Sequence, residues 1–319
     1  VAISAEPTGF SSSYTEGGVG AAIGDTDVVI TDTNNANMSG GKVSITTNFT
    51  TGDTLTFTNV GGVSGSYNSG TGVLTITGAG TIAEYQAFLA GVRYSSTSDD
   101  PTAGGTKTSR VISTIVQDQI TLNPSNTAFS TVTITPVNDA PVVDLNAGGV
   151  GQDVTTAFTE QTPVLIAPVG TLIDVDSATL TALTVTLTTR PDGNAVESLS
   201  LNAAAMTAAS GAGLTVSYTS GTGVLSITGL ATKAVYQSIL QGILYNDTSD
   251  TPTTSNRSIT VVANDGATPS AAQTVTLTVA AVNDAPTATN LSAAETYVED
   301  TALNLIDIVA SDVDSASVT

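Results

Sequence analysis

The sequence predicts an all-β protein built from tandem β-sandwich domains, each with one short helix, arranged end to end. Thr, Ser, Gly, Val and Ala dominate the chain, a composition that suits short strands joined by tight turns. Several segments alternate apolar and hydroxylated residues with a period of two, as half-buried antiparallel strands do. Long stretches also occur twice in the same order, which indicates a tandem duplication.

The repeat is defined by a short motif that occurs twice, PVNDAP at 136–141 and AVNDAP at 281–286. SGTGVLTITG at 69–78 returns as SGTGVLSITG at 220–229, and the segment 83–102 returns at 234–253. We therefore expect three sequential copies: domain 1 at 1–138, domain 2 at 139–283 and the truncated start of a third at 284–319. The chain stops inside this third copy, so we expect a longer parent protein.

The strands of the second copy are the clearest in the sequence. Period-two alternation predicts strands at 181–187, 214–218, 224–227, 258–262 and 274–279. Gly-Thr-Gly at 70–72 and 221–223 supplies turn residues that tolerate positive φ. Around 81–90 and 232–241 apolar residues recur every four positions instead, which favours a short helix over the competing interpretation, a buried strand.

Composition excludes several classes of function. The chain has no Cys and no His, so it lacks thiolate metal sites, disulfides and the commonest catalytic base. Seven Lys and Arg against 28 Asp and Glu give a formal charge of −21, which disfavours nucleic acid and anionic membranes as partners. No apolar run is long enough to insert into a membrane, and no secretory leader opens the chain. Hard cations are the natural counter-charge.

The acids recur at fixed places relative to each copy of the VNDAP motif. A Glu occupies the same place in all three copies, at Glu16, Glu160 and Glu299. An Asp-x-Asp follows it, aligned as Asp25 and Asp27, Asp174 and Asp176, and Asp312 and Asp314. Asp118 aligns with Asp265, and Arg110 with Arg257; we expect each Arg to pair with a nearby acid and Tyr94 and Tyr245 to pack in the cores.

Strand direction predicts that these acids converge where one domain meets the next. A strand of about six residues spans roughly 20 Å, so successive strands carry the chain from one end of a sandwich to the other. The first joint would gather Glu16, Asp99, Asn138, Asp139, Asp174, Asp176 and Asp265. The second would gather Glu160, Asp247 or Asp250, Asn283, Asp284, Asp312 and Asp314.

Converging carboxylates require cations. Two unit charges about 4 Å apart repel by roughly 4 kcal/mol at an effective dielectric near 20. Ca²⁺ prefers oxygen-only ligand sets of flexible geometry, whereas Mg²⁺ demands a stricter octahedron. The alternatives to metal binding are structural roles: an Asp-x-Asp often only forms a turn, and each Glu could be a solvated residue at a strand end. Recurrence of the same acids around every VNDAP copy favours calcium.

Together these motifs resemble the calcium-binding pattern of cadherin-type domains. The order is Glu, Asp-x-Asp, an acid before the penultimate strand, Asn264-Asp265-Gly266, and Asn-Asp-x-Pro. The VNDAP ending and the YQxxLxGxxYxxTSDxPT segment are similar to cadherin-like repeats of very large bacterial surface proteins, including type I-secreted adhesins. The resemblance implies Greek-key sandwiches outside the cell with calcium at each linker. It also implies that Asp25, Asp27 and Asp118 form the upper half of a joint to a preceding domain. The chain departs from animal cadherins at Pro136 and Ala281, where their linkers carry an Asp, and at Gln117-Asp118-Gln119.

The sequence thus predicts a non-enzymatic, calcium-rigidified extender of a bacterial cell-surface adhesin or extracellular filament. Its partners would be calcium ions, neighbouring repeats and, in some settings, like molecules or a surface ligand. The alternative is a module that binds glycan or protein through a loop such as 24–41 or 190–197. A hydrolase would need an acid pair in a cleft, and the sequence shows none.

Overall fold

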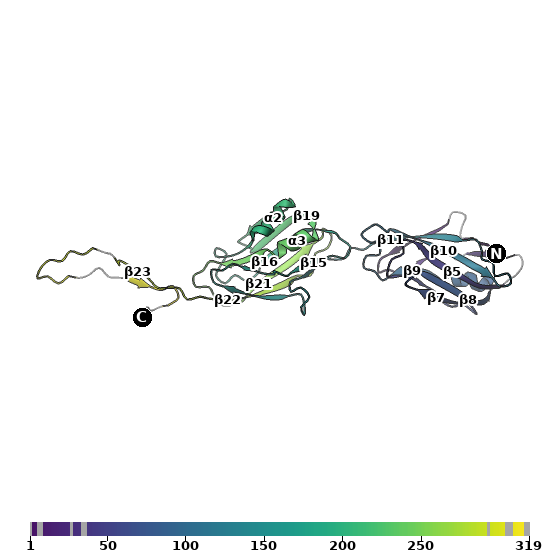
Figure 1. Ribbon diagram of the computed structural model, residues 1–319, viewed down its shortest axis with the longest axis horizontal. Helices are drawn as coiled ribbons and strands as arrows, with labels where there is room; N and C mark the ends of the chain where they lie inside the picture. The colour runs from purple at the N-terminus through teal and green to yellow at the C-terminus, as the bar shows by residue number, and fades with distance from the viewer. Residues whose placement is uncertain are drawn as a thin grey trace. The chain divides into compact units, whose positions relative to one another are not determined.

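The computed structural model describes residues 2–4, 9–25, 28–32, 37–291, 294–303 and 309–315. Contacts between Cα atoms divide the chain into two units. Unit 1 is Val1–Asp139 with Val175–Ser177, and unit 2 is Ala140–Asp174 with Ala178–Thr319. Both units are mostly strand, with few short helices (Figure 1).

Unit 1 is a sandwich of a large and a small sheet. The large sheet has the order β2-β11-β10-β5-β8-β7, the small one β3-β9-β6, and β1 pairs with β4. The strands are β1 (Ala2–Ser4), β2 (Phe10–Thr15), β3 (Ala21–Ala22), β4 (Val29–Thr31), β5 (Asn37–Thr47), β6 (Asp53–Thr56), β7 (Ser64–Asn68), β8 (Val73–Thr81), β9 (Arg93–Ser96), β10 (Ser109–Asp118) and β11 (Ala128–Thr135).

Unit 2 repeats this topology strand for strand. Its sheets have the orders β13-β22-β21-β16-β19-β18 and β14-β20-β17, and β12 pairs with β15. The strands are β12 (Val142–Asp144), β13 (Val154–Thr159), β14 (Val164–Leu165), β15 (Thr171–Ile173), β16 (Thr179–Leu187), β17 (Glu197–Leu201), β18 (Thr215–Thr219), β19 (Val224–Thr232), β20 (Ile243–Asp247), β21 (Arg257–Asn264) and β22 (Gln273–Ala280); β23 (Thr287–Thr289) and β24 (Val309–Ser311) form a further hairpin.

The strand order is that of a Greek-key sandwich in the cadherin and immunoglobulin class. In each unit the first long strand runs parallel to the last one, β2 beside β11 and β13 beside β22, while their other neighbours are antiparallel. The predicted fold class is therefore confirmed. Both units add a hairpin to the large sheet, β7–β8 and β18–β19, whose turns contain Gly72 and Gly223 at positive φ.

Period-two patterning fixes the cores as the sequence predicts. Along β21 every second residue is buried, and Ile259, Val261 and Ala263 pack into the core of unit 2. Unit 1 has an equivalent core that includes Leu74, Phe88 and Ile112. Each unit is thus a separate sandwich with its own apolar interior.

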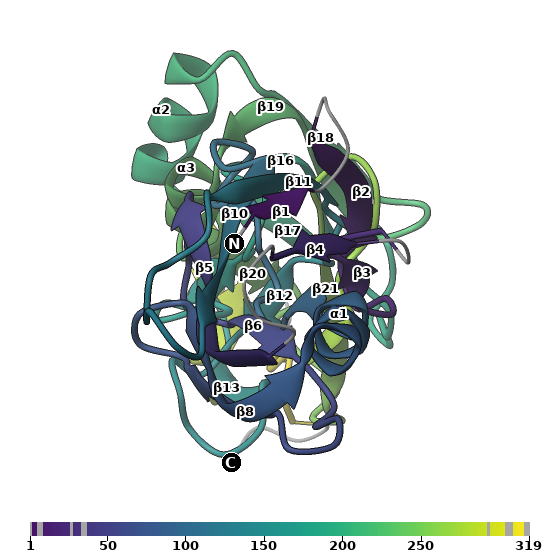
Figure 2. The ribbon, with the colours of Figure 1, turned by 90° about the vertical axis from the view of Figure 1, so that its right-hand side faces the viewer.

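A short helix follows the added hairpin in both units, as predicted for 81–90 and 232–241. Helix α1 (Ile82–Ala90) begins at Thr81, which forms a capping box with Glu84, and it continues directly from β8 (Figure 2). Helix α3 (Lys233–Leu240) begins at Thr232. Both helices bury their apolar residues, so they cover the sandwich.

Unit 2 has a second helix that the sequence reading did not predict. Helix α2 (Ala203–Gly211) lies between β17 and β18, and Asn202 caps its first turn by accepting a hydrogen bond from Ala205 N. It lies beside α3 on the same side of the unit (Figure 1). The approach is close: a Cβ on Gly242 would meet the Cβ of Ala205 at 2.4 Å.

Candidate calcium-binding sites

Acids of unit 1 gather where β2, β9 and β11 end. Because β2 and β11 run parallel, Glu16 and the VNDAP segment leave the sheet at the same end. The backbone N–H of Glu16 donates to Thr135 O at 3.0 Å, and its carboxylate Oε2 accepts from Val137 N at 2.9 Å. A pocket there is lined by Glu16, Asp99 and Asp139 together with the 96–98 segment.

Asp176 joins this group through the backbone. Its Oδ2 accepts a hydrogen bond from Asp139 N at 3.2 Å, and its short segment, Val175–Ser177, belongs to unit 1 by its contacts. Asn138 Nδ2 donates to Asp139 O at 2.8 Å, which orders the turn. The structure thus brings together Glu16, Asp99, Asn138, Asp139 and Asp176.

Like charges make this arrangement unfavourable without a cation. The pKa of Glu16 is raised, first by burial and then by the carboxylates of Asp139, Asp176 and Asp100, while the hydrogen bond from Val137 N lowers it. The pKa of Asp139 is raised by burial and then by Asp176 and Asp99. Every charge that contributes to these two shifts is negative, so the group is poised to accept positive charge.

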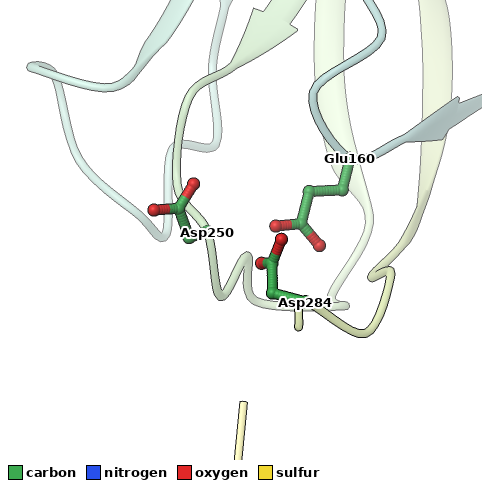
Figure 3. A group of neighbouring side chains, drawn as sticks. All are labelled: Glu160, Asp250 and Asp284. Atoms are coloured by element: carbon green, nitrogen blue, oxygen red, sulfur yellow. The ribbon is translucent and has the colours of Figure 1, made fainter. Parts of the chain in front are cut away.

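Unit 2 builds the same arrangement from the next copy of the motif. Glu160 follows β13, Asp250 lies beyond β20 and Asp284 follows β22. Each offers a carboxylate oxygen within 4.8 Å of the others. Figure 3 shows the carboxylates of Glu160 and Asp284 facing each other, with Asp250 beside them. The Glu160 side chain is only 4% exposed, and its Oε2 accepts from Val282 N at 2.8 Å, as Glu16 does from Val137.

Two carboxylate oxygens of this second group are buried without a donor. Among the residues that the structure describes, neither Glu160 Oε1 nor Asp284 Oδ2 has a hydrogen-bond partner. A buried, ionised oxygen with no partner is costly, and in native proteins such atoms are nearly always satisfied. A cation placed between the two side chains would satisfy both atoms.

Asp312 and Asp314 complete the second group. Asp284 N donates to Asp314 Oδ2, and Asp312 Oδ1 accepts from Asp314 N at 3.0 Å. The pKa of Asp284 is raised by burial and then by Asp314, Asp250 and Asp312. Asn283 Nδ2 donates to Asp284 O at 2.8 Å, the same contact that Asn138 makes. The two VNDAP copies therefore present the same local geometry and the same excess of negative charge.

This donor set fits calcium. Its acidic members offer carboxylate oxygen atoms, and a Ca²⁺ ion takes six to eight oxygen ligands in flexible geometry. Neither thiolate nor imidazole exists in this chain to favour a softer metal.

Asp247 lies outside the second group, contrary to the first of the two expected alternatives. It is the last residue of β20 and points inward, fully buried, where its Oδ2 accepts from Arg257 Nη2 at 3.0 Å. Asp250 is the residue that reaches the Glu160 group. The cause is alternation along the strand, which turns Asp247 towards the core.

Both buried arginines pair with acids, as expected, but Arg110 pairs with one carboxylate and Arg257 with three. Arg110 Nε donates to Asp53 Oδ2 at 2.7 Å, with both side chains fully buried. Arg257 contacts three carboxylates in unit 2, those of Asp192, Glu197 and Asp247. Each guanidinium also binds the backbone of the loop that carries the candidate ligand Asp99 or Asp250, through Pro101 O and Thr253 O. The acids Asp53, Asp192 and Glu197 were not singled out from the sequence.

At the opposite end of unit 2, Asp174 and Asp265 follow β15 and β21. Asp174 is 5% exposed, and Asp265 Oδ1 accepts from Ala267 N and Thr268 N in a tight turn. In unit 1 the corresponding turn is made by Asp118, whose Oδ1 accepts from Ile120 N and Thr121 N.

The strand register corrects the alignment of Asp25 with Asp174. β4 pairs with β1 as β15 pairs with β12, and Asp32 follows β4 as Asp174 follows β15. Hydrogen bonds, first from Thr121 N and also with the Asp32 side chain, hold the pKa of Asp118 below its usual range. Asp32, which the sequence reading missed, therefore takes the place expected for Asp25. Asp25 lies in the segment after β3, and Asp27 is outside the described residues.

The structure describes the two candidate ligand-binding loops to different extents. Part of 24–41, namely 26–27 and 33–36, lies outside the described residues. In the loop 190–197, Glu197 is fully buried against Arg257, and Arg190 Nη1 donates to Ser220 O.

No helix in the described part of the chain is long and apolar enough to cross a membrane.

Comparison with known proteins gives similarity at the level of solved structures alone. No protein-family model and no curated protein sequence matches the chain. Three human cadherin-23 repeats (EC21-23) align with a TM-score of 0.37 and 14% identity, covering 96% of this chain and 78% of theirs. Mouse cadherin-23 EC22-24 aligns with a TM-score of 0.33 and 13% identity, covering 99% and 79%.

A bacterial adhesin domain is also similar. The C-terminal domain of the Streptococcus agalactiae AgI/II polypeptide BspA aligns with a TM-score of 0.23 and 10% identity, covering 75% of this chain and 84% of that domain. Identities and TM-scores this low carry no argument about function. The fold of this chain rests on its own strand pairing, which makes it a pair of cadherin-like Greek-key sandwiches.

Proposed function

We propose that the chain is a set of calcium-binding structural repeats, an extender segment of a bacterial cell-surface adhesin or extracellular filament. The repeats would be 1–138, 139–283 and the truncated start of a third at 284–319. Calcium would bind where each repeat passes into the next and stiffen the chain there. The protein would act outside the cell, bound to calcium and to neighbouring repeats of its parent, and would have no catalytic role.

The observation that carries this proposal is the Glu160, Asp250 and Asp284 group. Three carboxylates converge within 4.8 Å, and two of their oxygens are buried without any donor among the described residues. A turn former or a solvated strand end would keep its carboxylate in water or satisfied by backbone N–H groups. A buried pair of carboxylate oxygens without donors is instead the arrangement that a bound cation would stabilise.

The first copy of the motif supports the same function independently. Glu16 accepts from Val137 N as Glu160 accepts from Val282 N, and Asp139 N binds Asp176 as Asp284 N binds Asp314. In both copies the pKa of the Asp after the Asn is raised by burial and by neighbouring carboxylates. Two sites with one chemistry suit an array in which every linker binds calcium.

Removing calcium tests the proposal directly. Extracellular calcium modules have dissociation constants of about 10⁻⁴ to 10⁻³ M, so about 10 mM calcium would stabilise the fold by roughly 1.4 to 2.7 kcal/mol per site. We expect calcium to raise the melting temperature and EDTA to lower it, with a change in the radius of gyration by X-ray scattering. Magnesium at the same concentration is the control. An identical melting curve and scattering profile with calcium and with EDTA would refute the proposal.

A ligand-binding module remains the second candidate, because an apolar pocket opens beside the 24–41 loop. It is lined by residues that include Ile3, Ile23, Val28 and Leu89. Binding to a glycan array that disappears on deletion of 33–36, and that survives EDTA, would favour this function over a spacer.

A further inference from the structure

Side chains of helix α3 bind the backbone of the segment that contains β15 and Asp174. Two of its polar residues, Lys233 and Gln237, and its C-cap residue, Gln241, are spaced four apart and so lie on one face. Gln241 Nε2 donates to Gly170 O at 2.9 Å, Gln237 Oε1 accepts from Leu172 N at 3.2 Å, and Lys233 Nζ donates to Asp174 O. Their partners are every second residue of the segment that contains β15.

The two spacings match in length. Four residues of α-helix rise about 6.0 Å, and two residues of strand advance about 6.6 Å. Successive side chains on α3 therefore meet successive backbone groups on the same edge of β15. The two glutamine contacts fix the register of α3 against β15. In that register the ammonium group of Lys233 lies at the backbone of Asp174, so Lys233 is not a free surface lysine. Its own backbone N–H also lies 3.4 Å from Ala178 O, beyond the Asp174–Asp176 turn.

Lys233 occupies an electrostatically unfavourable position in α3. It is the first residue of α3, where the helix dipole disfavours a positive charge. In unit 1 the same position is Ile82, and the first turn carries the favourable Glu84. In unit 1 the counterpart of Gln237, Gln86, makes a different contact by donating from Nε2 to Val28 O at 2.5 Å, and there is no cation at the position of Lys233. Helix stability therefore does not explain Lys233.

We propose that Lys233 is a built-in counter-cation of Asp174 and weakens calcium binding by its carboxylate. The inference rests on the proposed function, since it concerns the affinity of one of the calcium sites. The ammonium group offsets the charge of the Asp174 carboxylate when calcium is absent and repels calcium when it binds. Two half-sites of one topology would thus differ in affinity: Asp174 with Lys233 nearby, and Asp32 with Ile82.

The size of the effect follows from charge and distance. A unit charge and a divalent ion about 7 Å apart interact by an amount that corresponds to roughly a tenfold change in affinity at high effective dielectric, and salt reduces it. We therefore expect Lys233→Ile to tighten calcium binding at the Asp174 site by about three- to tenfold at low ionic strength. At about 1 M salt, where the screening length is about 3 Å, the gain should nearly vanish.

The experiment is calcium titration by calorimetry on the full chain, on three single variants, and on Asp174→Asn with and without Lys233→Ile. Lys233→Ile introduces the residue that unit 1 uses at this position, and Lys233→Arg keeps the charge and a donor. Lys42→Ile, on the exposed face of β5, makes the same change in net charge elsewhere and should leave affinity unchanged. In an Asp174→Asn background, Lys233→Ile should have no effect, because the two changes act on one site.

The outcomes separate the inference from the proposed function. Tighter binding in Lys233→Ile alone, lost in Asp174→Asn and reduced by salt, supports the inference. Unchanged or weaker binding in Lys233→Ile overturns it, since Lys233 would then be inert or a support for the turn, while calcium binding itself would stand. A wild-type chain that binds no calcium would overturn the proposed function as well.

Discussion

Glu160 combines two roles that a single carboxylate rarely has. One oxygen fixes the linker by accepting from Val282 N, and the other is buried without a donor among the described residues. The first role orders the backbone that carries Asp284, and the second directs negative charge to the place where Asp250 and Asp284 converge. The side chain therefore links the path of the chain to the proposed cation site.

Replacing Glu160 by Gln should separate these roles. The amide oxygen can still accept from Val282 N, but the charge is lost. We expect calcium affinity at this site to fall by about tenfold or more, while stability in EDTA stays equal or rises because one buried charge is removed. Calcium titration and urea denaturation, each with and without EDTA, measure the two effects. Glu84→Gln makes the same change of charge in the capping box of α1 in unit 1, where Gln can replace Glu, and is the control.

Equal calcium affinity in Glu160→Gln and wild type would show that the carboxylate is no ligand. A loss of stability in EDTA as large as the loss in calcium would assign Glu160 a purely structural role. Both readouts are needed because a buried acid can serve packing and binding together.

Several residue-level features lay beyond sequence reasoning for definable reasons. The repeated Glu and VNDAP positions were predictable because identity between the copies marks them. Asp32 was missed because Asp25-Thr26-Asp27 imitates the Asp174-Val175-Asp176 spacing, and strand register alone shows that β4 is the counterpart of β15. The sequence could not distinguish Asp247 from Asp250 as the ligand, because residue types alone do not show which side chains of a strand point into the core.

Among the elements, the two covering helices differ in how they begin. Thr81 and Glu84 form a reciprocal capping box at α1, with Glu84 N to Thr81 Oγ1 at 3.2 Å and Thr81 N to Glu84 Oε2 at 2.7 Å. At α3 the cap is single: Val235 N donates to Thr232 Oγ1 at 3.4 Å, and no Glu returns the contact. The first helix is therefore the better anchored of the two.

Removing the caps should reveal this difference. We expect Thr81→Ala to lower the free energy of unfolding of unit 1 by about 1 kcal/mol, and Thr232→Ala to lower that of unit 2 by less. Urea denaturation followed by circular dichroism measures both. Conservative Thr→Ser variants at the two positions should retain most of the stability. Equal losses at both caps would show that the box adds nothing to the single contact.

Helices α1 and α3 were predictable because their buried residues recur at helical spacing. Helix α2 was not, because 203–211 consists largely of small residues and has no apolar stripe. The only local signal was Asn202, a good N-cap residue, ahead of a run of alanines with high helix propensity. Contact with α3 and Gly242 supplies the rest, and such contacts depend on the folded sheet.

At the scale of the whole molecule, unpaired acidity determines how stability responds to pH. The pKa values of Glu16, Asp139 and Asp284 are all raised, first by burial and then by other carboxylates. A carboxyl group whose pKa is higher in the folded than in the unfolded chain stabilises the fold at low pH. That contribution is lost as the pH rises through the folded pKa.

In EDTA, stability should therefore increase as the pH falls from about 7 towards the ordinary carboxyl range near 4.5. In saturating calcium the trend should weaken or reverse, because the ion binds the deprotonated carboxylates and competes with protons. Melting temperatures across this range, with and without calcium, test the prediction. Parallel pH profiles in the two conditions would mean that the raised carboxyls and the ion do not share a site.

The parallel pairing of the first and last long strands also governs how a repeat responds to tension. In unit 2 the first long strand, β13, and the last strand of the sandwich, β22, are joined in parallel by six residue pairs. Pulling the start of β13 away from the end of β22 slides one strand along the other, so their hydrogen bonds share the load instead of opening one after another. The parallel pairing that places Glu160 beside the VNDAP segment therefore also lets the hydrogen bonds between β13 and β22 resist an extending force together.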